Sequence, residues 1–144
     1  MKLVVYGTFR EGGMLAHHLK SVREKGTSEI VKLNGVRLYV AGMAPGAIIT
    51  GYEEDETVAE LITADLTSDE ERDLFEMLDY VEGVSMGLYE RNEIDIGHNK
   101  AIIYTYCRDV EGCPVITDWM EWDILSVEEK LEALKEVKNS IVCI

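Results

Sequence analysis

The stretch that decides the fold runs from Asp65 to Ile96 and reads DLTSDEERDLFEMLDYVEGVSMGLYERNEIDI. Thr67 and Ser68 are both favourable N-cap residues with a glutamate three positions later, so a capping box is expected to open a helix here. Apolar residues then recur at spacings of four and three, which predicts one buried helix face. The residues of that face are Leu74, Leu78 and Val81.

The end of this helix carries the most informative side chain. Gly83 is expected to stop the helix in a left-handed conformation, and residues 89–96 are expected to form the next strand. Glu82 therefore stands at a helix C-terminus, one turn after Asp79. Both the helix end and the neighbouring carboxylate, together with any burial, would raise the pKa of Glu82 toward that of a general base. The alternative is an ordinary solvated glutamate at a helix end.

Two separated motifs resemble one known family. Residues 78–83 read LDYVEG and are followed by Gly87-x-Tyr89, while residues 5–8 read VYGT after an apolar run; residues 38–46 extend the match less closely. This combination resembles the γ-glutamylcyclotransferase-like family, which includes γ-glutamylcyclotransferase and γ-glutamylamine cyclotransferase. The resemblance covers about residues 2–107 and implies an α+β fold, a small mixed β-barrel flanked by helices.

The resemblance also implies an activity. The substrate's own α-amino group attacks its γ-glutamyl carbonyl, which yields 5-oxoproline and a released amine, so the protein needs no nucleophile of its own. Glu82 is implied as the general acid/base. The implied substrate-binding residues are Tyr6, Gly7, Thr8, Phe9, Arg10 and Tyr89. The alternative is a module of the same fold that binds or sequesters a small metabolite without turning it over.

From the residues alone, the first loop has two interpretations. The glycine-rich segment 7–13 follows a strand, so it is either a plain turn or a nest of backbone N–H groups that binds an anion. It matches neither a Walker loop nor a dinucleotide fingerprint, and no cofactor is expected. Phe9 stands where the family usually has leucine, and residues 16–18 read AHH instead of containing the Asn-His pair of the γ-glutamylamine branch. The sequence therefore leaves the leaving amine open.

The composition is that of a globular protein with one domain. The chain has 144 residues, 47% hydrophobic and 29% charged, which corresponds to a single domain over residues 1–144. Residues 1–107 are expected to form the barrel core with the site, and residues 108–144 a loop and a C-terminal helix. That helix is expected to turn three residues inward, Val127, Leu131 and Leu134. Residues 30–40 are expected to form a hairpin about the pair Asn34-Gly35.

Charge and cysteine usage limit the partners. Fourteen Lys and Arg against 28 Asp and Glu give a net charge of −14, which argues against nucleic acid and anionic membranes. No apolar stretch is long enough to span a bilayer. Three cysteines without a secretory signal, Cys107, Cys113 and Cys143, favour a reduced, cytoplasmic setting, and their spacing predicts no metal site. The expected partner is a small γ-glutamyl substrate; the oligomeric state is left open.

Two tryptophans in the second part of the chain allow two interpretations. Trp119 and Trp122 lie in a region with few periodic signals. They could form a stacking platform for a ligand, or they could cover an open end of the barrel.

Overall fold

The computed structural model describes residues 1–142, with side chains described up to residue 135; Cys143 lies outside the described residues. Two 3₁₀ turns, Ala16–Leu19 and Val84–Met86, accompany the regular elements. The elements follow one another as β1 (Lys2–Val5), α1 (Lys20–Glu24), β2 (Gly26–Asn34), β3 (Val36–Ala41), β4 (Ala44–Ile49), β5 (Glu56–Ala64), α2 (Ser68–Val81), β6 (Tyr89–Ile96), β7 (Asn99–Tyr106), β8 (Val115–Ile116), α3 (Trp119–Asp123) and α4 (Val127–Val142).

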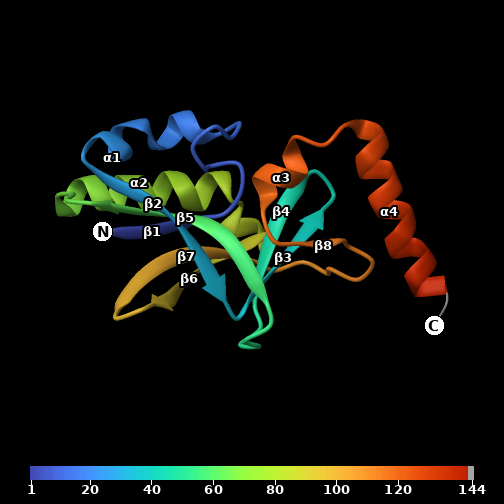
Figure 1. Ribbon diagram of the computed structural model, residues 1–144. Coiled ribbons are helices and arrows are strands. Elements are labelled where there is room, and N and C mark those ends of the chain that lie inside the picture. Colours follow the sequence, from blue (N-terminus) through green and yellow to red (C-terminus); the bar gives the residue numbers. More distant parts are fainter. Residues whose placement is uncertain (143–144) are drawn as a thin grey trace.

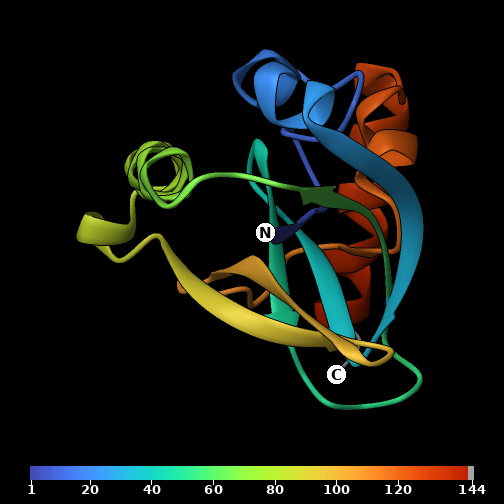
Figure 2. The ribbon, with the colours of Figure 1, turned by 90° about the vertical axis from the view of Figure 1, so that its left-hand side faces the viewer.

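The strands form two sheets (Figures 1 and 2). The larger sheet has the order β2-β5-β1-β7-β6 and is antiparallel except between β1 and β7, which run parallel. The smaller sheet has the order β4-β3-β8 and is antiparallel throughout. The first strand of the chain therefore lies in the middle of the larger sheet.

Strand β1 shows how the layers are stacked. Successive side chains of a strand point to opposite faces. Leu3 and Val5 belong to the core that the larger sheet shares with α1 and α2, whereas Val4 and Tyr6 belong to the core shared with the smaller sheet. Because both faces of β1 are covered, its residues 3–5 and the Tyr6 that follows it are all apolar or aromatic and all buried. The larger sheet is thus the middle layer between helices and a second sheet.

Helix α2 begins and ends as the sequence predicts. Thr67 accepts a hydrogen bond from the Glu70 N–H, and the Glu70 carboxylate accepts one from the Thr67 N–H, which completes the capping box. Glu82 is the C-cap residue, and Gly83 follows with φ of 66°, a left-handed conformation that favours glycine. Leu78, on the apolar face, is 1% exposed.

The α+β fold is confirmed, but its strands do not close into a barrel within residues 1–142, because they divide between the two sheets. The hairpin expected about Asn34-Gly35 is wrong for the same reason. Asn34 pairs with Glu56 in the larger sheet, while Val36 pairs with Ile49 in the smaller one. The alternation of residues 30–40 identified two strands correctly but carried no information about which partner each strand takes.

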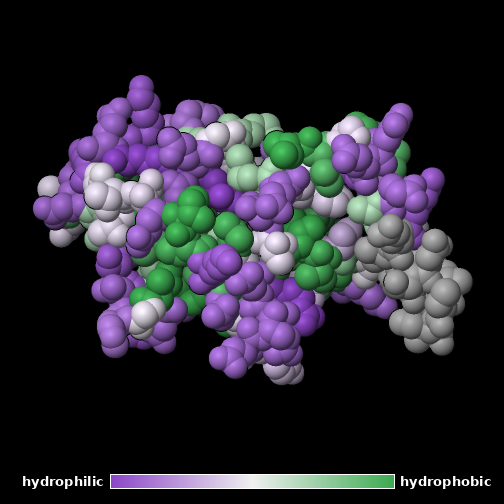
Figure 3. Space-filling view, viewed as in Figure 1, coloured by the Kyte–Doolittle hydropathy of each residue, from purple (hydrophilic) through white to green (hydrophobic). Residues whose placement is uncertain are grey.

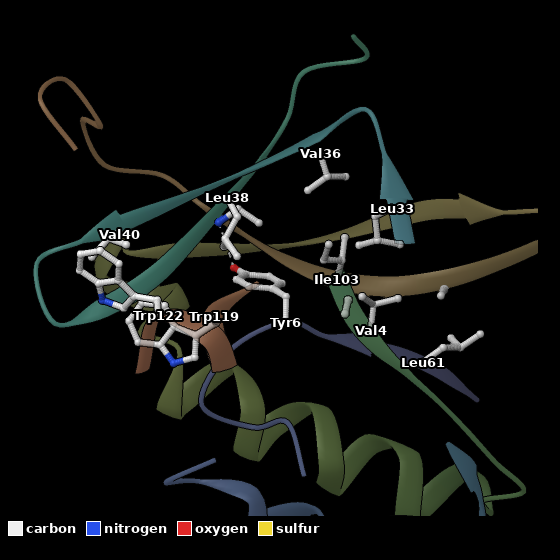
Figure 4. Packing of buried hydrophobic residues seen from close by; sticks show 13 residues of the cluster. Val4, Tyr6, Leu33, Val36, Leu38, Val40, Leu61, Ile103, Trp119 and Trp122 are labelled. Atoms are coloured by element: carbon white, nitrogen blue, oxygen red, sulfur yellow. Dashed lines mark hydrogen bonds between the residues drawn. The ribbon is translucent and has the colours of Figure 1, made fainter. Parts of the chain in front are cut away.

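Residues 108–142 contain more structure than a loop and a helix. Strand β8 joins the smaller sheet, and α3 buries Trp119 and Trp122 in the core between the sheets, beside Val40 and Tyr6 (Figure 4). Because both indoles are more than nine-tenths buried, they are core residues and not a stacking platform for ligands.

The prediction that Val127, Leu131 and Leu134 of the C-terminal helix face inward is wrong. Val127 and Leu131 are 74% and 52% exposed, and Leu134 is 36% exposed. Helix α4 stands at one end of the molecule, apart from the helices that cover the larger sheet (Figure 1). It meets the core between the sheets through Ala133 instead, on another side of the helix.

The surface seen in Figure 3 is mostly hydrophilic, with separate hydrophobic patches. This agrees with the large excess of acidic residues in the sequence. Among the described residues, no helix is long and apolar enough to cross a membrane.

Candidate active site

A cavity of about 240 Å³ opens where four parts of the chain meet. These parts are the end of β1 with its following loop, the beginning of β4, the end of α2 and the beginning of β6. Most of its wall is apolar, with residues such as Leu78, Val81 and Leu88. The cavity also brings together the predicted site residues Tyr6, Gly7, Thr8, Phe9, Glu82 and Tyr89.

The first loop turns its carbonyl groups into the protein. The carbonyls of Gly7, Thr8 and Arg10 accept hydrogen bonds from the N–H groups of three loop residues that follow them, Arg10, Leu15 and Gly13, at 3.0, 2.9 and 2.7 Å. The Phe9 carbonyl accepts one from Arg23 Nη2 at 2.6 Å. Within the described part of the chain, the N–H groups of residues 7–9 have no acceptor outside the regular strands. Consecutive free N–H groups on a cavity wall form a site suited to an anion.

Glu82 brings an ionisable group into this apolar wall. Burial raises the pKa of its carboxyl group from the ordinary 4.5 to about 7. Asp79, which was expected to contribute to this rise, is occupied elsewhere: its carboxylate accepts hydrogen bonds from Arg91 Nη2 at 2.9 Å and from the Tyr104 hydroxyl at 2.5 Å. Among residues 1–135, no group donates a hydrogen bond to the carboxyl group of Glu82. It is therefore free to exchange protons with a bound molecule.

Two buried tyrosines complete the polar part of the wall. The Tyr6 hydroxyl donates to the Tyr104 carbonyl at 2.6 Å and accepts from the Ala47 N–H at 3.3 Å. The Tyr89 hydroxyl donates to the carbonyl of Pro45. Burial raises the pKa of both phenols, and the nearby Glu82 adds to the rise. Both tyrosines are thus neutral at physiological pH, with hydroxyl protons committed to backbone carbonyls.

Arg10 is the one predicted site residue that does not line the cavity. Its guanidinium donates to Asp118 at 2.6 Å, and the residue is 7% exposed. Asp118 also accepts from the Met120 N–H and so caps α3. Arg10 thus joins the first loop to the C-terminal part of the chain.

Sequence reasoning missed three residues of this region. Pro45 packs against the first loop so closely that a Cβ on Gly7 would lie 2.2 Å from its Cγ atom. Glu60 accepts a hydrogen bond from the Glu11 N–H of the loop, and Arg23 donates one to its Phe9 carbonyl. A signal existed for Glu60, because it is the one charged residue in the run TVAELITA of residues 57–64. A single charge within an apolar strand indicates a buried, paired group.

Apart from proton transfer, the described residues offer little chemistry. Residues 1–135, whose side chains the structure describes, contain no group of three or more His, Cys, Asp or Glu side chains that could hold a metal ion. The arrangement instead offers a loop with unpaired backbone N–H groups, one carboxyl group with a pKa of about 7 and an apolar wall. It is suited to orienting a small molecule with a negative end and moving its protons.

Comparison with known proteins identifies the family. The model of the family "Gamma-glutamyl cyclotransferase, AIG2-like" matches residues 3–123, which include both sheets, α2 and α3. The chain therefore belongs to this family of γ-glutamyl cyclotransferase-type proteins. The comparison with curated proteins finds no match.

Solved structures share the fold. An uncharacterized protein from Pyrococcus horikoshii is 24% identical, with a TM-score of 0.65 over 86% of this chain and 93% of its own. The protein ytfP from Escherichia coli is 23% identical, with a TM-score of 0.57 over 83% and 94%. A uropathogenic E. coli-specific protein is 17% identical, with a TM-score of 0.60 over 85% and 94%. At these identities the likeness concerns the fold alone.

Proposed function

We propose that this protein converts a γ-glutamyl amide into 5-oxoproline and a free amine, with Glu82 as general acid/base. Membership in the family supports the reaction type. The observation that carries the assignment of Glu82 is its position in the cavity wall with a pKa raised to about 7 by burial. A carboxyl group with this pKa is ionised in a large fraction of molecules near neutral pH and can also return a proton.

The loop of residues 7–9 binds the α-carboxylate of the substrate through its free N–H groups. This places the α-ammonium group beside Glu82 and folds the substrate so that the nitrogen faces its own γ-carbonyl carbon. Glu82 takes a proton from the ammonium group, and the resulting amine attacks the carbonyl. A C–N bond forms in the five-membered ring, and the original amide C–N bond breaks. Two protons pass from the attacking to the leaving nitrogen, and Glu82 relays them.

The tyrosines have a supporting part in this mechanism. Because the hydroxyl protons of Tyr6 and Tyr89 are held by backbone carbonyls, these groups shape the cavity and fix Pro45 beside the loop. Thr8 borders the bound carboxylate, and Phe9 closes the apolar floor of the cavity, being 4% exposed. Arg10 acts from outside the cavity by holding the loop to Asp118.

The size of the cavity bears on the substrate. A volume of about 240 Å³ corresponds to roughly eight water molecules at about 30 Å³ each. This suits the γ-glutamyl group and leaves little room for a large leaving group. The leaving amine therefore extends toward the mouth of the cavity, where solvent takes it up after the amide bond breaks.

The direct test measures 5-oxoproline released from a panel of γ-glutamyl amides. The panel contains γ-glutamyl dipeptides, γ-glutamyl-lysine and glutathione, with calorimetric binding of the same compounds in parallel. We expect product from at least one compound and none from its α-glutamyl isomer, in which the ring cannot close in the same way. Tight binding without product over the whole panel would favour the alternative, a module that sequesters γ-glutamyl compounds. If the protein neither binds any compound of the panel nor forms product from it, both functions are rejected.

A further inference from the structure

Glu60 is the most deeply buried carboxyl group among the described side chains, at 2% exposure in the middle of β5. Both of its oxygens are used. One accepts hydrogen bonds from the Glu11 N–H at 2.9 Å and from Arg23 Nη2 at 2.8 Å, and the other accepts from Arg23 Nε at 3.0 Å. Burial alone would raise the pKa of Glu60, but these hydrogen bonds outweigh it and the pKa is lowered. Glu60 is therefore a buried anion.

Arg23 extends this ion pair into the first loop. Besides Glu60, its guanidinium donates to the carbonyl of Phe9 at 2.6 Å and to the carbonyl of Ala16 at 3.1 Å. Together with the Glu11 N–H, the ion pair thus holds three backbone groups of the segment between β1 and α1. These groups belong to Phe9 at the cavity wall, to Glu11, and to Ala16, where the 3₁₀ turn begins. The planar fork of arginine allows these bonds to form at once, which lysine cannot reproduce.

The hydrogen bond from Arg23 to the Phe9 carbonyl matters because it leaves the N–H groups of residues 7–9 free for a ligand. Among the four consecutive carbonyls of residues 7–10, three are held by N–H groups of the loop itself, and the fourth, that of Phe9, is held by Arg23. With every carbonyl turned into the protein, the N–H groups of residues 7–9 remain for a ligand. Without Arg23, the Phe9 carbonyl would lose its partner, and this peptide could rotate toward the cavity and present oxygen to the incoming carboxylate.

We infer that Arg23 and Glu60 are positioning residues that fix the loop of residues 7–16 in its anion-binding conformation. The inference rests on the proposed function, since it assigns the bound anion to the substrate α-carboxylate. A buried ion pair adds little stability over well-packed apolar residues of similar volume. The Arg23–Glu60 pair instead specifies the backbone conformation of the loop through its five hydrogen bonds.

The test uses the full chain with the double substitution Arg23→Met and Glu60→Leu, which removes both charges together and so leaves neither unpaired. We expect the variant to fold, and hydrogen exchange of the hydrogen-bonded amides of Arg10, Glu11, Gly13 and Leu15 to accelerate at least tenfold. The KM for the best γ-glutamyl amide and the Kd for 5-oxoproline should each rise at least tenfold, while kcat changes less than threefold. Purely structural damage would lower the amount of active protein and would not separate KM from kcat.

The matched control is the ion pair of Arg37 and Asp55, whose side chains meet at 2.9 Å outside the cavity wall. Replacing it by Met and Leu should leave KM, kcat and exchange in the first loop unchanged. If the Arg23 and Glu60 double variant does not fold, Arg23→Lys takes its place. It keeps the charge beside Glu60 but cannot make all the bonds, so KM should rise several-fold at constant kcat.

Two results would overturn the inference: native loop protection with native KM in the folded double variant, or native KM and native loop exchange in Arg23→Lys. The exchange measurement keeps this test separate from the proposed function. If the wild-type protein releases no 5-oxoproline from any γ-glutamyl amide, the proposed function fails. The loop exchange rates of the variants still decide whether the ion pair fixes the loop.

Discussion

Glu60 binds the first loop at the Glu11 N–H, Glu82 shares a cavity wall with residues 7–9 of that loop, and the protein surrounds these two carboxyl groups in opposite ways. Glu60 accepts three hydrogen bonds, two of them from a guanidinium, and its pKa is lowered. Glu82 lies in an apolar wall, and its pKa is raised to about 7. Burial acts on both groups, so the difference comes from the partners. A carboxyl group with hydrogen-bond partners is suited to holding structure as an anion, and one without them is suited to exchanging protons near neutral pH.

The largest expected effect is on activity. Replacing Glu82 by Gln preserves the shape of the side chain and removes its proton transfer, so kcat/KM should fall about 10²–10⁴-fold. The rate of 5-oxoproline release at saturating and at limiting substrate concentration gives kcat and kcat/KM for wild type and variant. The control is Glu90→Gln, on the exposed side of β6, which should keep wild-type activity. Full activity in Glu82→Gln would show that Glu82 is not the general acid/base.

The next largest effect is on stability and concerns Glu60. Glu60→Gln leaves the guanidinium of Arg23 without its anion. The free energy of unfolding, measured by urea titration at pH 7, should therefore fall by about 3–5 kcal/mol. Because the pKa of Glu60 is lowered in the folded state, this contribution is present above about pH 4.5 and is lost as the pH falls through the folded value. Wild type and variant should therefore converge in acid. The control is Asp95→Asn, which breaks an exposed ion pair with Lys100 and should lower the free energy of unfolding by about 1 kcal/mol or less.

The third effect is the pH dependence of catalysis. The proposed mechanism needs ionised Glu82, whose pKa is about 7, so kcat/KM should fall tenfold per pH unit below that value and be about 100-fold below its plateau at pH 5. Initial rates across pH 5–9 in one mixed buffer test this. A profile that is flat between pH 5 and 7 would show that the proton is carried by another group.

The smallest effect has the opposite sign. Since the pKa of Glu82 is raised in the folded state, the folded protein binds this proton more tightly, and stability is lost as the pH rises from about 4.5 to about 7. Glu82→Gln should therefore have a free energy of unfolding about 3 kcal/mol higher than wild type at pH 8 and the same at pH 4. Thermal unfolding at both pH values measures it. Equal stability at pH 8 would mean that burial of Glu82 costs the fold nothing.

The sequence predicted best what depends on neighbouring residues. The capping box at Thr67, the stop at Gly83 and the strand of residues 89–96 are local features, and all three are observed. Six of the seven predicted site residues line one cavity, because two short motifs place them at the ends of β1 and α2. These motifs needed the family resemblance, since local periodicity alone indicates no ligand.

What the sequence could not predict depends on distant partners. Arg10 was expected to contact substrate, but it is engaged by Asp118, 108 residues later in the chain. Arg23 and Glu60 are 37 residues apart, and nothing in either segment indicates that they meet. The division of the strands between two sheets, which corrected the barrel, is likewise a matter of pairing over long separations.

The central place of β1 also determines when the protein can become functional during synthesis. β1 is made first, yet its partners β5 and β7 are completed only after residues 64 and 106. At about 5–20 residues per second on the ribosome, β1 waits several seconds for its second neighbour. Until then its apolar side chains are exposed on an unpaired strand, and the loop that follows it has no fixed wall. Contacts of such long range make folding slow, and the excess of acidic over basic residues keeps the unfinished chains apart in the meantime.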